Sequence, residues 1–344
     1  METFLGIDYP TWWFLVVGAV FSGYAVLDGF DLGAGAWHLF LKKEKSRRIA
    51  LNAVGPVWDG NEVWLVIGGG ALFAGFPIMY ATLFSAMYIP FMLFLACLIF
   101  RAISIEFRSK ETMGWWRKTW DISYSVSSIM LALLLGVVLG NILKGIPLDE
   151  HYEFSGNWLD FLNPYAFSVG VTMLALFMVH GAIYLTMKTS GKLFYKATRF
   201  VNRAIIFFVV AFILTTIYSL IELRHLKSTF DENPFLYGVP LLSFLSIANI
   251  PRLVSKRRYM GAFVFSALTM SFLLILVAIQ FFPILIYSTD PEANHLTIYK
   301  AAASEKTLGI MLIMAAIGVP IVLSYTVFVY KTFWGKVEMD ENSY

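Results

Sequence analysis

Long hydrophobic runs alternate with short polar segments along the whole chain. Nine of these runs are long enough to cross about 30 Å of hydrocarbon as helices. They lie near 11–40, 53–76, 78–105, 121–143, 166–187, 204–223, 235–250, 261–288 and 308–332. The pattern predicts an all-α integral membrane protein with about nine transmembrane helices. Because no polar segment is long enough for a soluble module, we expect residues 1–344 to form a single polytopic membrane domain.

Composition agrees with this prediction. Hydrophobic residues make up 58% of the chain and charged residues only 14%, whereas a soluble domain carries about 25% charge.

Residues 1–10 contain Glu2 and Asp8 but no basic residue, so we expect no cleavable signal peptide. The single cysteine, Cys97, lies within the third run, which excludes a disulfide inside the chain.

Lysine and arginine are concentrated in every second connection. With the N-terminus outside, the inner connections and adjoining span ends hold Lys42, Lys43, Lys45, Arg47, Arg48, Arg101, Arg108, Lys110, Arg117, Lys118, Lys188, Lys192, Lys196, Arg199, Arg203, Arg252, Lys256, Arg257, Arg258, Lys331 and Lys336. The outer side holds Lys144, Arg224, Lys227, Lys300 and Lys306. Basic residues favour the cytoplasmic side of a membrane, so we expect an outer N-terminus and a cytoplasmic C-terminus. The net charge of +3 then reflects membrane anchoring and not binding to nucleic acid.

Five ionisable residues lie inside the first three runs: Asp28, Asp31, Asp59, Glu62 and Arg101. At 1.5 Å per residue, Asp28 and Asp31 lie about 26–30 Å along the first run, near its inner end. The acids of the second run lie about 10–15 Å from the start of that run, again at the inner end. The third run returns inward, so Arg101 reaches the same depth. We therefore expect the five side chains to gather on the cytoplasmic side.

This cluster has two physical interpretations. An ionisable group in hydrocarbon costs about 3 kcal/mol or more without water or a partner, so such groups usually mark an ion or proton path. Alternatively, Arg101 neutralises one acid and the polar set holds the helices together. A secondary transporter or channel that uses the carboxylates as an ion site is the alternative function. The absence of a detectable repeat and the position of the acids away from mid-membrane disfavour it.

Several segments carry a resemblance to a known family. The segments GFDLG (29–33), GPVWDGNEVWL (55–65), GGALFA (69–74) and FR (100–101) strongly resemble subunit II of the cytochrome bd-type quinol oxidases. The resemblance implies nine membrane helices and a heterodimer with a related subunit I, which carries the quinol site, two b-type haems and one d-type haem. It implies an electrogenic quinol:oxygen oxidoreductase of the bacterial cytoplasmic membrane that reduces O2 to water. Small single-span subunits and membrane lipids are further expected partners.

The resemblance also assigns roles to residues. It places Trp58 with Asp59, and Asp31, in proton delivery from the cytoplasm. Glu62 departs from the family, which often has glutamine there, and it either extends the polar route or pairs with Arg101. We therefore expect the proton pathway to use Asp31, Asp59, Glu62 and Asp28, with Trp58 and Arg101 in support. We expect Arg101 to pair with Asp59 or Asp31.

The histidines are candidate haem ligands, because haem iron takes axial His, Met or Cys. His38 lies near the inner end of the first run, and only His180, in the fifth, lies deep in a span. His151, His225 and His295 fall in outer connections. A bis-histidine site needs two facing histidines at one depth. We therefore expect this chain alone to bind no haem and no other metal and to hold no catalytic residue.

Overall fold

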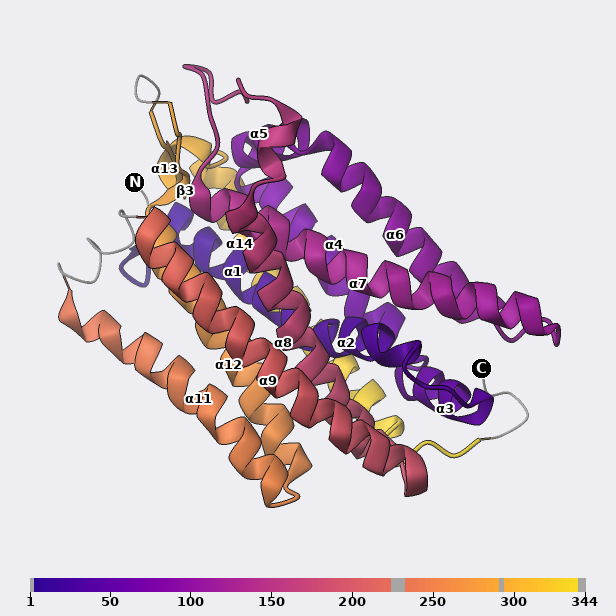
Figure 1. Ribbon diagram of the computed structural model, residues 1–344. Coiled ribbons are helices and arrows are strands. Elements are labelled where there is room, and N and C mark those ends of the chain that lie inside the picture. Colours follow the sequence, from indigo (N-terminus) through magenta and orange to yellow (C-terminus); the bar gives the residue numbers. More distant parts are fainter. Residues whose placement is uncertain (1–2, 224–232, 291–293, 340–344) are drawn as a thin grey trace.

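The computed structural model describes residues 3–223, 233–290 and 294–339, and these form one helical bundle (Figure 1). Arg224, His225 and Lys227, assigned above to the outer side, lie outside the described residues. The helices are α1 (Tyr9–Leu27), α2 (Gly29–His38), α3 (Glu44–Val54), α4 (Trp58–Gly75), α5 (Pro77–Ala86), α6 (Tyr88–Phe107), α7 (Gly114–Lys144), α8 (Pro164–Lys188), α9 (Gly191–Glu222), α11 (Gly238–Ser255), α12 (Tyr259–Phe281), α13 (Ile298–Ala301) and α14 (Glu305–Thr332). Two short 3-10 helices are η1 (Trp158–Phe161) and η3 (Pro234–Tyr237). The strand pairs are β1 (Thr3–Phe4) with β2 (Ile7–Asp8), and β3 (Ile284–Ile286) with β4 (Leu296–Thr297).

The all-helical prediction is confirmed. In the described residues, eight helices are long and apolar enough to cross a membrane, or nine if the bent pair of α4 and α5 counts as one span. The helices α1 and α2 together form one of these spans, Tyr9–His38. The backbone ladder continues across their junction, because the Asp28 N–H donates to the Tyr24 carbonyl at 2.8 Å and the Leu32 N–H to the Asp28 carbonyl at 3.0 Å.

Three predicted boundaries are wrong. Residues 53–57 do not belong to α4, which begins at Trp58. The third run, 78–105, is divided at Met87 into α5 and α6, and α5 begins at Pro77 at an angle of 118° to α4. Proline cannot continue a helix and forces the preceding residue out of the helical region, and Phe76 has φ −129° and ψ 65°. The eighth helix ends at Phe281, and residues 284–286 form β3 instead.

Successive spans run in opposite directions, so the connections gather at two ends of the bundle. At one end, the Lys196 ammonium donates to the Phe40 carbonyl at 2.5 Å, and the Val337 N–H donates to the Lys188 carbonyl at 2.9 Å. We call this end, which carries the α2–α3, α6–α7, α8–α9 and α11–α12 connections, the basic end. At the opposite end, the Ile146 N–H donates to the Tyr287 carbonyl at 3.0 Å. The loop containing η1, the β3–β4 pair and α13 lie there (Figure 1).

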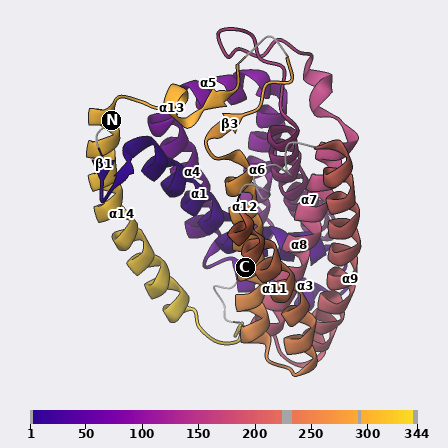
Figure 2. The same ribbon diagram turned by 90° about the vertical axis from the view of Figure 1, so that its left-hand side faces the viewer.

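The core of the bundle surrounds α2, all of whose residues are buried. Gly33 and Gly181 bring the α2 and α8 backbones into contact: a Cβ added at Gly33 would lie 1.8 Å from the Phe177 carbonyl oxygen. The Trp37 indole N–H also donates to the Met178 carbonyl, at 2.9 Å. By contrast, α14 lies at one edge of the bundle (Figure 2), and of its residues only Leu308 is buried.

Candidate functional site

A buried ion pair joins the first and third spans. Arg101, on α6, donates through Nη2 to Asp28 Oδ1 at 2.6 Å and through Nη1 to Asp28 Oδ2 at 3.2 Å. Neither side chain has any exposed surface. Arg101 Nη1 also lies 3.4 Å from Glu62 Oε2 on α4, and the guanidinium carbon lies 5.9 Å from the ring centroid of Trp58. The predicted gathering of Asp28, Glu62 and Arg101 is therefore confirmed.

The predicted partner of Arg101 is wrong, because it pairs with Asp28 and Glu62 and not with Asp59 or Asp31. The rotation of α4 explains part of this outcome. Its buried residues are Trp58, Asn61, Trp64, Gly68, Leu72 and Gly75, which recur every three or four positions and define the face toward the bundle. Asp59 lies one residue beyond this face and is exposed in the chain. Glu62 lies at the edge of the face, with a side chain that is 19% exposed.

Asp31 has a different partner, which sequence reasoning missed. The Asn61 amide nitrogen donates to Asp31 Oδ2 at 2.7 Å, and the Tyr330 hydroxyl donates to the Asn61 amide oxygen at 2.9 Å. Asp31 is completely buried, and its Oδ1 accepts no hydrogen bond from the described residues. Asn61 lies within the 55–65 segment, so the sequence held a signal that this residue belongs to the site. No sequence feature singled out Tyr330, because only folding brings the end of α14 to the start of α4.

The four acids therefore differ in how much of each residue is exposed at the surface of the chain. Asp59 is exposed, Glu62 is partly exposed, and Asp28 and Asp31 are fully buried. All four belong to the α1–α2 span and α4, and Asp59 lies in the first turn of α4, at the basic end. Carboxyl groups at graded depth can accept and release protons. The arrangement thus suits movement of protons between the surface of the chain and its interior.

A second buried ionic network lies closer to the basic end and was also missed. Asp121, on α7, pairs with two arginines. Its Oδ1 lies 2.6 Å from Arg108 Nε, and its Oδ2 lies 2.8 Å from Arg47 Nη1. His38 Nε2 lies 2.5 Å from the same carboxylate. The sequence pattern predicts only a role as membrane anchors for these arginines. Their pairing with an acid from a later helix could not be found without the fold.

The geometry of His180 bears on haem binding. Its Nδ1 lies 2.6 Å from the Ser266 hydroxyl, and its Nε2 lies 3.1 Å from the Val26 carbonyl oxygen. The ring also stacks on Phe263, with centroids 4.3 Å apart. Both nitrogens are thus engaged within the helix packing. The described residues contain no group of three or more His, Cys, Asp or Glu side chains that could hold a metal ion.

Comparison with known proteins gives consistent results. The family model for cytochrome bd terminal oxidase subunit II matches residues 9–333. Cytochrome bd-I ubiquinol oxidase subunit 2 of Escherichia coli (strain K12) is 33% identical, over 97% of each chain. Cytochrome bd ubiquinol oxidase subunit 2 of Bacillus subtilis (strain 168) is 30% identical, over 96% of this chain and 97% of the relative. A chain of the bd oxidase from Geobacillus thermodenitrificans has the same fold, with a TM-score of 0.79 at 18% identity, covering 94% of this chain and 98% of that chain.

The fold and the cluster define a multi-pass membrane protein with ionisable groups inside its spans. The chain belongs to the family of cytochrome bd terminal oxidase subunit II. The resemblance found in the sequence is confirmed, as is the prediction that the chain is a subunit of an oxidoreductase complex that contains a subunit I.

Proposed function

We propose that this chain delivers protons from the cytoplasm to the oxygen-reducing site of a bd-type quinol oxidase. Asp59 is the entry group, and Glu62, Asp28 and Asp31 carry or hold protons further inside. The observation that supports this most is the graded exposure of the acids, from exposed Asp59 to fully buried Asp31. Uptake from one side makes the reaction electrogenic, because each proton moves charge into the membrane.

The orientation of the chain is part of this proposal. The basic end faces the cytoplasm, because lysine and arginine favour that side of a membrane. The start of α1 then lies outside and the end of α14 inside, in the cytoplasmic membrane of a bacterium. Asp59, in the first turn of α4 at the basic end, lies within reach of cytoplasmic water.

Subunit I covers the exposed face of α4 in the proposed complex. Asp59, Val63, Val66 and Phe73 are exposed along this helix and recur at helical spacing. A carboxylate facing hydrocarbon is costly, so Asp59 needs a protein or water neighbour. Subunit I supplies that neighbour, along with the quinol site, two b-type haems and one d-type haem. Small single-span subunits and membrane lipids complete the complex.

The ion pair has a second role. Arg101, on α6, pairs with Asp28 of the first span and Glu62 of α4. These ion pairs hold the three spans against one another. This supports a positioning role for Asp28 and Arg101 in addition to the proton route, in which Asp59 and Asp31 are the main groups that exchange protons. Trp58 contributes by packing beside the guanidinium.

The proposal is tested by quinol-driven oxygen consumption of the purified complex. We expect Asp59→Asn to assemble with its full haem content and to consume oxygen at least about tenfold more slowly, within the range for loss of one proton-transfer group. Glu111→Gln is the matched control, because Glu111 is an exposed acid at the basic end outside the cluster. Equal rates for Asp59→Asn and the parent complex would overturn the proposal.

A further inference from the structure

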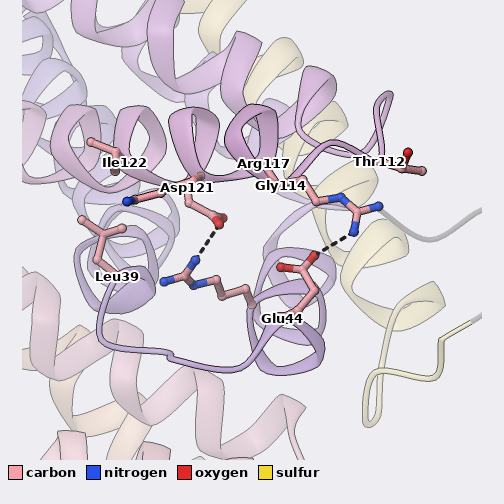
Figure 3. Close-up of a pocket in the computed structure, with 9 residues that line it drawn as sticks. Leu39, Glu44, Thr112, Gly114, Arg117, Asp121 and Ile122 are labelled. Atoms are coloured by element: carbon pink, nitrogen blue, oxygen red, sulfur yellow. Dashed lines mark hydrogen bonds and ion pairs between the residues drawn. The ribbon is translucent and has the colours of Figure 1, made fainter.

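A cavity of about 360 Å³ opens at the basic end, away from the acid cluster. It lies between the end of α2, the start of α3 and the first turns of α7 (Figure 3). Basic, acidic and apolar side chains line it together, and the ones that matter here are Leu39, Glu44, Arg47, Arg117, Lys118 and Ile122. None of the roles proposed above uses this cavity.

The two acids at the cavity are already neutralised by arginines. Arg47 Nη1 lies 2.8 Å from Asp121 Oδ2, and Arg117 Nη1 lies 3.5 Å from Glu44 Oε1. Figure 3 shows Asp121 and Glu44 on separate sides of the opening. Arg108, which is buried and does not line the cavity, pairs with both acids, at 2.6 Å to Asp121 and 2.9 Å to Glu44.

Positive charge therefore remains in excess at the opening. Three basic side chains, Arg47, Arg117 and Lys118, line the cavity with only two carboxylates, and the buried Arg108 pairs with the same two acids. Lys118 is exposed at the rim. Arginine and lysine at a membrane surface are the side chains that bind the phosphate groups of anionic lipids.

The apolar side of the cavity continues toward the membrane interior. Leu39 and Ile122 line the cavity and are 36% and 42% exposed. Val126 follows Ile122 by one helical turn on α7 and is 48% exposed. Trp115, also exposed at the start of α7, is a residue type enriched at membrane interfaces. A ligand here meets charge at one end and hydrocarbon-like surface at the other.

We propose that this cavity binds the phosphate group of an anionic phospholipid. Arg117 and Lys118 contact the phosphate. Arg47 stays paired with Asp121 and attracts the phosphate through its positive charge. The acyl chains lie along Leu39, Ile122 and Val126. The continuous apolar surface selects a lipid over free inorganic phosphate, whose chemistry otherwise matches the basic residues. This site is independent of the proposed proton route.

The test uses the assembled complex, stripped of lipid in detergent and titrated with phosphatidylglycerol while bound lipid is counted by native mass spectrometry. Each basic residue near a membrane contributes about 1 kcal/mol to binding of anionic lipid, so Arg117→Gln with Lys118→Gln should weaken phosphatidylglycerol binding at least about tenfold. Lys192→Gln with Lys256→Gln is the matched control, because it removes the same charge from exposed positions at the basic end. The exchange Arg117→Lys with Lys118→Arg should keep the binding.

Two further titrations distinguish the ligands. Phosphatidylcholine should bind more weakly than phosphatidylglycerol, and inorganic phosphate should not displace the lipid at millimolar concentration. Equal binding of the two lipids, equal losses in the test and control variants, or displacement by inorganic phosphate would each overturn the proposal. Oxygen consumption of the variants is measured separately, so failure of the lipid site is distinguishable from failure of the proton route.

Discussion

Arg101 and Asp28 form a two-pronged ion pair, with distances of 2.6 Å and 3.2 Å, in which neither side chain reaches the surface. Asp28 lies at the junction of α1 and α2, and Arg101 lies near the end of α6. The pair therefore fixes the third span against the first at the depth of the acid cluster. Removing one partner leaves the other charge buried without compensation.

The first prediction concerns this pair. Breaking a buried ion pair typically costs about 3–5 kcal/mol, so Arg101→Ala should strongly reduce the yield of assembled complex. Arg101→Lys retains the charge but loses the second hydrogen bond, and it should give an intermediate yield. Yield is measured by haem absorbance of the purified complex per gram of membrane. Parent-like yields for both variants would show that the pair does not hold the spans together.

The second prediction concerns Asn61, which holds Asp31 in place. Asn61→Ala removes the donor to Asp31 Oδ2, and leaving a buried polar group unsatisfied costs about 1–3 kcal/mol. We expect the complex to assemble with lower stability and to consume oxygen several-fold more slowly. Tyr330→Phe removes only the outer bond to Asn61 and should have a smaller effect. An equal or larger effect of Tyr330→Phe would contradict this order.

The third prediction concerns the contact between α2 and α8. Gly33→Ala places a methyl group 1.8 Å from the Phe177 carbonyl oxygen, a backbone atom of the neighbouring helix α8. Overpacking of this kind typically costs about 1–3 kcal/mol or more, so the melting temperature of the complex should fall clearly. Gly18→Ala, in the same span, meets nothing within 4 Å and serves as the control. A similar small change for both variants would mean that the helices do not pack this closely.

The fourth prediction concerns His180. Because its ring nitrogens lie at hydrogen-bond distance from the Ser266 hydroxyl and the Val26 carbonyl, His180 has no free nitrogen for iron. His180→Gln should therefore leave the number of haems per assembled complex unchanged, although stability falls. The ratio of haem to protein, measured by reduced-minus-oxidised spectra, is the readout. Loss of one haem band from a complex that still assembles would contradict it.

The parts of the fold that follow from local chemistry were predictable from the sequence. Hydrophobic runs located the spans, because length and apolar character decide whether a helix crosses a membrane. The boundary between the second and third runs falls at Pro77, where α5 begins. The division of the third run at Met87 was missed, because a continuous run of apolar residues hides a break between two helices. The 284–286 strand was missed because it depends on pairing with residues 296–297.

The sequence identified the ionisable residues of the cluster better than it identified which of them pair. Helix rise placed Asp28, Glu62 and Arg101 at one depth, and the structure brings them together. Helix rotation decided which acid met the arginine, and rotation depends on packing across the whole bundle. Tyr330 reaches Asn61 from a helix at the far end of the chain, so no local pattern could have found it.

The central claim, proton delivery through Asp59, is tested most directly by proton uptake during a single turnover. The reduced complex in lipid vesicles is mixed with O2 while a pH indicator reports protons taken from the medium and haem absorbance reports oxygen chemistry. Asp59→Asn keeps size and hydrogen-bonding capacity but holds no exchangeable carboxyl proton. We expect O2 binding at the parent rate, with proton uptake and membrane potential delayed at least about tenfold. Uptake by Asp59→Asn at the parent rate, with normal membrane potential, would contradict the account.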